Sequence, residues 1–213
     1  MRSRPGPLLP AALAATVSLA IVLAACGGPG GSGSGSGTDH PSGDEVVLRV
    51  EHRGGFVPVE WLFSGTPAFT LVGDGRVIVP GAVAAMFPGP ALPPLMARRL
   101  NDDGVEAVLQ AVGATKQFAR DAQWQGARNF VADAAETVFT VHADGQDVVV
   151  SIYGLGAFLP NEAPPQVSRE ELAAHVALSA LADRLGNPDA WIPATGWAET
   201  GWQAYSPTAL RLL

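Results

Sequence analysis

The sequence predicts an α+β domain in which an antiparallel sheet of about five strands packs against two helices. Two observations support this prediction. Two β-rich stretches are each interrupted by an Asp-Gly pair, at residues 74–75 and 144–145, which is typical of a hairpin. Two segments with helical apolar spacing begin with capping residues, near residues 101 and 168. The chain has 213 residues, 47% of them hydrophobic, which suffices for one domain with a substantial core.

The N-terminal stretch has the layout of a secretory signal. Two arginines precede an apolar run at residues 8–25, and the run ends in Leu-Ala-Ala-Cys at residues 23–26. Small residues directly before a cysteine resemble the lipobox of bacterial lipoproteins. The resemblance implies cleavage of residues 1–25 between Ala25 and Cys26, and a diacylglyceryl group on the Cys26 sulfur. Such a lipid anchor, with palmitate-type acyl chains, holds a protein at the extracytoplasmic face of the cell membrane.

Two alternatives to the lipid anchor are an uncleaved membrane span and an ordinary signal with an incidental cysteine. The apolar run is interrupted by Pro10, Thr16 and Ser18, and a span needs about 20 predominantly apolar residues. Cys26 is the only cysteine of the chain and occupies the position that lipidation requires. With its sulfur acylated, no thiol remains for a disulfide, a nucleophile or a thiolate metal site. Two acyl chains are enough for stable anchoring.

After the anchor, residues 26–44 are predicted to be a flexible tether, because Gly and Ser bury no apolar surface. Residues 45–213 form the single expected domain, and the apolar end at residues 210–213 leaves open whether that domain continues further. Without the signal segment, 11 basic residues remain against 20 acidic ones, a formal charge of −9. This charge excludes nucleic acid as a partner and argues against electrostatic adhesion to anionic lipid head groups.

Five strands follow from the apolar patterns. Residues 46–51 alternate between apolar and polar positions, residues 68–72 and 76–79 form a first hairpin, and residues 139–143 and 148–150 form a second. Residues 69–75 and 139–145 align position by position, which fits either an internal duplication or independent selection of good hairpin residues. Residues 95–100 are a further candidate, as an edge strand.

The two helices are predicted from their capping residues and apolar faces. Asn101, Asp102 and Asp103 offer N-cap oxygens, and Glu106 completes a capping box with Asp103. The apolar face of this first helix is formed by Val105, Val108, Leu109 and Val112. Ser168 and Glu171 form a second capping box for a helix to about residue 185, with Leu178, Leu181 and Leu185 as its buried stripe. Residues 119–133 give no clear pattern.

Two segments of the domain resemble a family of uncharacterised lipoproteins from high-GC Gram-positive bacteria. They are residues 69–81, which include the first hairpin, and the Pro-rich residues 88–94. The resemblance covers about residues 45–153. A codon bias towards GC fits the composition, since Lys116 is the sole lysine beside twelve arginines. The resemblance implies no activity.

No arrangement of residues in the sequence predicts catalysis, a metal or a cofactor. His175, Ser179 and Asp183 lie four apart on the second helix, but a catalytic relay needs His between Ser and Asp. We therefore expect this row to be a solvated helix face. Asp102 and Asp103 are explained by the helix dipole, and Asp144 and Asp147 near His142 by a hairpin turn. His52 and His142 could bind a metal only if the fold brought them together.

The C-terminal region is rich in aromatic residues, namely Trp191, Trp197, Trp202 and Tyr205. These side chains could form a binding surface for a sugar or peptide, or could clamp the C-terminal segment onto the sheet, which is the interpretation we favour. The sequence thus predicts a membrane-anchored envelope lipoprotein without an assigned enzymatic activity. Its leading function is to bind or scaffold an envelope protein or glycan. The alternatives are a cell-wall or glycan hydrolase and a small-ligand module that uses the aromatic residues.

Overall fold

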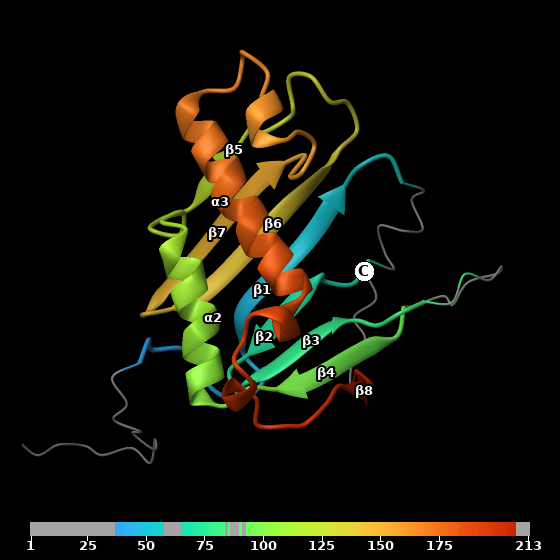
Figure 1. The fold of residues 1–213 in the computed structure, drawn as a ribbon, viewed down its shortest axis with the longest axis vertical. Coiled ribbons are helices and arrows are strands. Elements are labelled where there is room, and N and C mark those ends of the chain that lie inside the picture. Colours follow the sequence, from blue (N-terminus) through green and yellow to red (C-terminus); the bar gives the residue numbers. More distant parts are fainter. Residues whose placement is uncertain (1–36, 58–64, 84, 86–89, 91–92, 208–213) are drawn as a thin grey trace, which may run out of the picture. The chain divides into compact units, whose positions relative to one another are not determined.

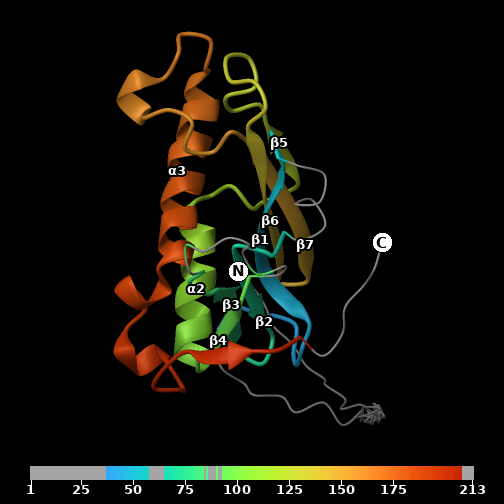
Figure 2. The ribbon, with the colours of Figure 1, turned by 90° about the vertical axis from the view of Figure 1, so that its right-hand side faces the viewer.

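The computed structural model describes residues 37–57, 65–83, 85, 90 and 93–207, which form one sheet with two helices on a single face (Figures 1 and 2). The strands are β1 (Val46–Gly54), β2 (Phe69–Val72), β3 (Arg76–Pro80), β4 (Leu95–Arg99), β5 (Ala122–Trp124), β6 (Ala135–Ala143), β7 (Gln146–Tyr153) and β8 (Gln203–Tyr205). The helices are α2 (Asp102–Ala114) and α3 (Arg169–Gly186), with 3-10 turns η1 (Pro160–Glu162), η2 (Pro188–Ala190) and η3 (Ala194–Gly196).

The predicted antiparallel sheet of about five strands is wrong, because the sheet has eight strands and is mixed. Its order is β5-β7-β6-β1-β2-β3-β4-β8, and β5 pairs with β7 in parallel while the other pairs are antiparallel. β5 and β8 form the two edges and have three residues each. A strand of this length is too short to show an alternating pattern, so its existence depends on pairing with a distant neighbour. β4 occupies the segment expected as an edge strand, but β8 covers its outer side.

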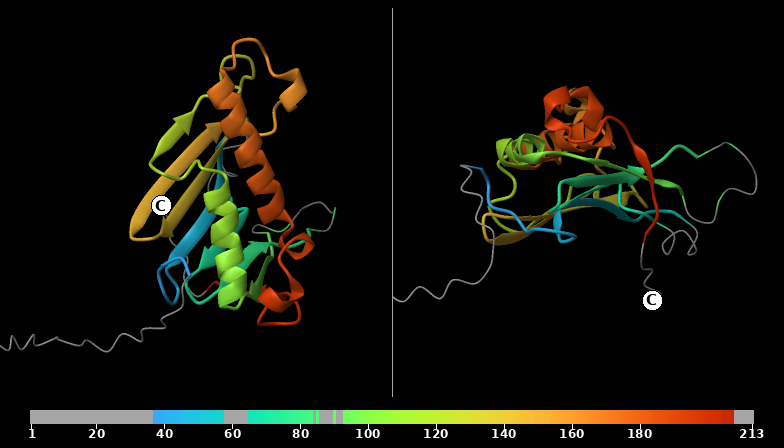
Figure 3. Two further views of the ribbon diagram at one scale, coloured as in Figure 1. Left: turned by 60° about the vertical axis from the view of Figure 1, so that its left-hand side comes forward. Right: turned by 90° about the horizontal axis from the view of Figure 1, so that it is seen from below.

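The core is built on the face of the sheet that the helices cover. The strand register places one apolar residue from each of four neighbouring strands in a row across this face: Val150, Phe139, Val50 and Phe69, each at most 3% exposed. The adjacent row on the opposite face contains Thr140, Arg49 and Thr70. This division into an apolar face and a more polar face is what allows a sheet to carry helices on one side only. Figure 3 shows both helices on that side.

The two Asp-Gly pairs form hairpin turns of different geometry. Asp144 and Gly145 both have positive φ, 52° and 68°, as a two-residue type I′ turn requires. In the first hairpin only Gly75 has positive φ, at 83°, and residues 73–75 form a three-residue loop. Position-by-position similarity of the two segments therefore does not extend to the same turn.

The helices begin as the capping residues allow, with one correction. α3 has the predicted capping box. The Ser168 side chain accepts a hydrogen bond from Glu171 N, and the Glu171 side chain accepts one from Ser168 N. In α2 the N-cap is Asn101, whose side chain accepts from Gly104 N at 3.0 Å, so the capping box predicted from Asp103 is wrong. Glu106 instead accepts a hydrogen bond from Thr38 N at 2.8 Å, which holds the pKa of Glu106 below its usual value.

The described end of the predicted tether, residues 37–44, lies against the domain. Besides the contact of Thr38 with Glu106, the backbone of Asp39 and the turn residue Asp144 exchange hydrogen bonds of 2.7 and 3.1 Å. Gly43 O accepts from Asp74 N at 2.7 Å in the first hairpin turn. Both hairpin turns and α2 therefore hold this segment before β1 begins.

The start of α2 packs directly against the backbone of η3. A Cβ atom on Gly104 would lie 2.2 Å from Gly196 O, and Asn101 N donates to the same oxygen at 3.0 Å. The side chain of Asn101 also donates to Thr195 O at 2.7 Å. Glycine at position 104 is thus needed for the approach of the C-terminal segment to the helix.

We predict that Gly104→Ala destabilises the protein by about 1–3 kcal/mol, because the new methyl group would overlap backbone that cannot rotate away. Gly113→Ala in the same helix is the matched control, since nothing lies within 4 Å of a Cβ there. That substitution should stabilise the protein by up to about 1 kcal/mol through helix propensity. Urea unfolding followed by tryptophan fluorescence measures both, and equal effects of the two substitutions would contradict the prediction.

Candidate functional site

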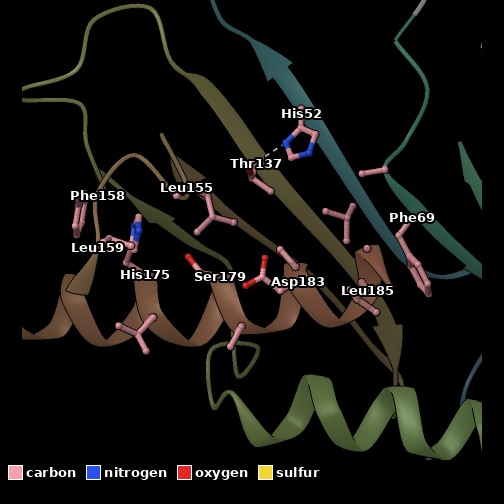
Figure 4. A pocket seen from close by; sticks show the side chains of 17 residues that line it. His52, Phe69, Thr137, Leu155, Phe158, Leu159, His175, Ser179, Asp183 and Leu185 are labelled. Atoms are coloured by element: carbon pink, nitrogen blue, oxygen red, sulfur yellow. Dashed lines mark hydrogen bonds between the residues drawn. The ribbon is translucent and has the colours of Figure 1, made fainter. Parts of the chain in front are cut away.

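A cavity of about 610 Å³ lies between α3 and the sheet. Its sheet wall comes from β1, β2 and β6, its opposite wall from one flank of α3, and its end from the loop after β7 (Figure 4). α2 lies on the far side of α3 from this cavity (Figures 1 and 4). The cavity therefore occupies the part of the sheet face beside α3 that the second helix does not reach.

Most of the lining is apolar, with a few polar side chains. The apolar part includes Val50 and Phe69 of the core row and Leu155, Phe158 and Leu185 around them. The polar side chains are His52, Thr137, His175, Ser179 and Asp183. Cavities of this size, mostly apolar with a few polar groups, are typical binding sites for small molecules.

His175 is the most buried polar side chain of the cavity, with 2% of its surface exposed. Its ring stacks on Phe158, with centroids 4.0 Å apart and planes 18° from parallel. Neither ring nitrogen has a hydrogen-bond partner of normal geometry within the described part of the chain. Burial lowers the pKa of His175 from its usual 6.5, and a hydrogen-bonding contact with the Phe158 backbone opposes this only in part. The imidazole is therefore neutral at pH 7.

Ser179 lies one helical turn after His175 in the same row. Its Oγ is buried and has no hydrogen-bond partner among the described residues, although serines inside helices commonly bond the preceding turn. The Ser179 and Asp183 oxygens point towards the sheet across the cavity (Figure 4). Asp183 itself is exposed and lies at the rim.

The opposite wall carries a histidine–threonine pair. His52 and Thr137 face each other in the β1–β6 register, and His52 Nδ1 lies 3.2 Å from Thr137 Oγ1. Thr137 is 3% exposed, whereas His52 is exposed at the rim. The two walls therefore differ. His52 and Thr137 on the sheet hydrogen-bond each other, whereas His175 and Ser179 on α3 do not.

The expectation that His175, Ser179 and Asp183 form a solvated helix face is wrong for His175, which is buried, and for Ser179, whose Oγ is buried, whereas Asp183 is exposed as expected. The row is turned away from the leucine stripe, as the spacing indicates, yet it faces the cavity because the sheet extends past the flank of α3. The argument against a catalytic relay stands, since no hydrogen bond joins these three side chains. Ser179 has no hydrogen-bonded base of the kind that activates a serine nucleophile.

The four aromatic residues near the C-terminus hold their own segment on the sheet. Trp197 is 9% exposed and meets Trp202 edge to face at 5.7 Å. The indole N–H groups of Trp191 and Trp202 donate to Arg184 O at 2.8 Å and Asp189 Oδ2 at 2.7 Å. Tyr205 lies in β8, which pairs with β4. Trp197 and Tyr205 thus attach the segment to the sheet, as the clamp favoured from the sequence predicts, whereas Trp191 contacts α3.

Arg98 joins this clamp to the sheet. Its guanidinium carbon lies 4.0 Å from the Trp197 ring centroid, and its Nη1 is 2.6 Å from Asp189 Oδ1. Two further nitrogens of the guanidinium donate to Glu199 O. No local pattern predicts this role of Arg98, because its aromatic and acidic partners lie about a hundred residues later in the chain.

The remaining site candidates are separate from the cavity or from one another. Thr137, which faces His52, lies near the start of β6, whereas His142 lies near its end. His142 Nδ1 is 2.6 Å from Asp147 Oδ1. Asp102 and Asp103 are exposed at the start of α2. Within the described ranges, no three His, Asp or Glu side chains come close enough together to hold a metal ion. Ala25, Cys26 and residues 210–213 lie outside the described residues.

Comparison with protein-family models, with curated proteins and with solved structures finds no match for this chain. Neither described helix is both long and apolar enough to cross a membrane. The cavity geometry is therefore the main basis for a functional interpretation.

We predict that acid destabilises the protein partly through His175. In the unfolded chain this histidine takes up a proton near pH 6.5, whereas in the folded protein its lowered pKa delays protonation. The unfolded state binds more protons in this window, so the free energy of unfolding falls as the pH drops through 6.5 towards the folded pKa. Glu171, the charged residue one turn before His175 on α3, accepts a hydrogen bond from Ser168 N.

The substitution His175→Phe keeps a ring against Phe158 and removes the titration. Urea unfolding at pH 8, 6.5 and 5 should show a smaller loss of stability in this variant than in the wild type. Ala173→Phe, which adds the same ring at an exposed position of α3 and removes no titratable group, is the control and should leave the loss unchanged. An identical pH dependence in His175→Phe and the wild type would contradict the prediction.

Proposed function

We propose that this protein is a lipid-anchored lipoprotein of the extracytoplasmic membrane face that binds a small, largely apolar ligand in the cavity beside α3. The observation that carries the proposal is a mostly apolar cavity of about 610 Å³ with buried hydrogen-bonding groups that lack partners in the described part of the chain. A buried polar group without a partner costs stability, about 1–3 kcal/mol. A ligand that enters the cavity can remove this cost.

The position of the anchor in the sequence supports the same proposal. A diacylglyceryl group on Cys26 would keep the domain within tether length of the membrane, where apolar molecules concentrate. Residues 37–44 contact both hairpin turns and α2, so on the domain side the tether would begin near residue 37. A binding protein in this location needs no group of catalytic residues, and no hydrogen bond joins His175, Ser179 and Asp183 in the cavity.

Ligand binding is tested by filling the cavity rim. Ala180 lines the cavity and is exposed, so Ala180→Trp should block entry without disturbing the core. Ala173→Trp is the matched control, because Ala173 is exposed on the same helix and does not line the cavity. Membrane vesicles containing the full chain are illuminated with an aliphatic diazirine probe, and the tryptic peptide between Arg169 and Arg184 is analysed by mass spectrometry.

We expect the wild type and Ala173→Trp to be labelled in this peptide, and labelling of Ala180→Trp to fall at least about fivefold. The physical reason is that an indole at the rim occupies the space through which the probe would enter. Equal labelling of all three proteins would show that the probe does not use the cavity and would reject the proposed binding function.

The anchor is tested by Cys26→Ser, which removes the sulfur that would carry the lipid. The wild type should incorporate labelled palmitate and lose residues 1–25, as shown by the mass of its N-terminal peptide. Cys26→Ser should incorporate no label and keep the uncleaved segment. Normal processing of Cys26→Ser, with membrane retention unchanged, would reject the lipid anchor while leaving the cavity proposal intact.

A further inference from the structure

The polar groups of the cavity indicate what kind of ligand it would accept. The lining contains neither lysine nor arginine at any described position. His175 is neutral at pH 7, and the single acidic side chain of the lining, Asp183, lies at the exposed rim. The interior therefore offers hydrogen bonds without any positive charge.

This arrangement is unfavourable for an anionic head group. A carboxylate or phosphate inside the cavity would lose its hydration without gaining a cation, and a buried unpaired charge is far more costly than a buried hydroxyl. It would also pass the negative charge of Asp183 on entry. A fully apolar ligand would fill the space but would leave the His175 nitrogens and Ser179 Oγ without partners.

An uncharged hydroxyl group can hydrogen-bond these atoms after a small side-chain rotation, because they have almost no accessible surface in the structure itself. A neutral imidazole has one nitrogen that accepts and one that donates, and a serine hydroxyl can do both. His175 and Ser179 lie one turn apart on the same row of α3, about 6 Å along the helix axis, so one small group can lie between them. A ligand hydroxyl can donate to one of these side chains and accept from the other.

We propose that the cavity selects an amphiphile whose uncharged hydroxyl group bonds Ser179 and His175 while its apolar chain lies against Phe69, Leu155 and Leu185. This inference rests on the proposed binding function and specifies its ligand class. His175 supplies the buried polar end, Phe158 fixes the ring by stacking, and Ser179 supplies the second hydrogen bond. These are positioning and specificity residues, without a chemical step.

The test compares two photoreactive probes with the same diazirine-bearing twelve-carbon chain, one a primary alcohol and the other a carboxylic acid. Membrane vesicles containing the full chain are labelled at pH 8, where an ordinary histidine is uncharged. The variants are Ser179→Ala and, as a matched control, Ser206→Ala, which makes the same change at an exposed position outside the cavity. For each protein, the ratio of alcohol to acid labelling is measured in the peptide between Arg169 and Arg184.

We expect the alcohol to label this peptide more strongly than the acid in the wild type and in Ser206→Ala. Loss of one hydrogen bond in Ser179→Ala should lower the ratio about threefold to tenfold. Each probe partitions into the vesicles equally for all three proteins, so the change in ratio reports the cavity. Adding the probes in buffer or in protein-free lipid vesicles distinguishes a dissolved alcohol from a membrane lipid as the source.

The two proposals fail in distinguishable ways. If both probes label the peptide and Ser179→Ala leaves their labelling ratio unchanged, the cavity binds apolar chains without selecting for a hydroxyl group. That result overturns this inference alone. If the acid labels more strongly than the alcohol, the inference is likewise overturned. If neither probe labels the peptide, the proposed binding function fails together with the inference.

Discussion

The sheet is too wide for two helices to cover, and the rest of the molecule depends on this mismatch. Neighbouring strands lie about 4.8 Å apart and packed helices about 8–10 Å apart, so two helices cover roughly four strands. Eight strands leave a large part of the apolar face without a helix. The C-terminal segment, with Trp197 and Ile192 buried, covers the β3–β4 side. Beside α3, near β1 and β2, neither helix nor segment fills the space, and the cavity lies there.

The same constraint explains why the aromatic residues serve the fold. A segment without regular helices can cover a sheet only if large side chains supply the buried area, and tryptophans do this. Each of Trp191 and Trp202 also directs its indole N–H to an acceptor in its own chain. Arg98 then fixes the layer from the sheet side by stacking on Trp197 and pairing with Asp189. The aromatic residues near the C-terminus are thus occupied by structural contacts, whereas His175 and Ser179, whose buried polar atoms lack partners among the described residues, line the cavity.

Local signals were readable from the sequence, whereas pairings over long distances were not. The hairpin turns, the Ser168 capping box and the apolar faces of both helices depend on residues a few positions apart. β5 and β8 exist only because β7 and β4 offer them hydrogen bonds, so the predicted strand number was too low. The cavity was missed for a related reason. Helical spacing shows that His175 and Ser179 lie off the leucine stripe, but only the width of the sheet decides whether that flank meets solvent.

Not every buried polar atom without a partner points to a ligand, since Trp124 Nε1 also lacks one within the described residues and lies outside the cavity. Arg76 Nε lacks a partner, but the same guanidinium pairs with Asp44 and Asp74, so its charge is compensated. His175 is almost fully buried, and its ring meets the Phe158 backbone but has no hydrogen bond of normal geometry within the described residues. Ser179 Oγ, the next polar atom along its row, has no partner there either. A leucine at position 175 and an alanine at 179 would avoid both penalties and suit the helix equally. The polar pair therefore costs folding stability, and the hydroxyl group of the proposed ligand would recover that cost.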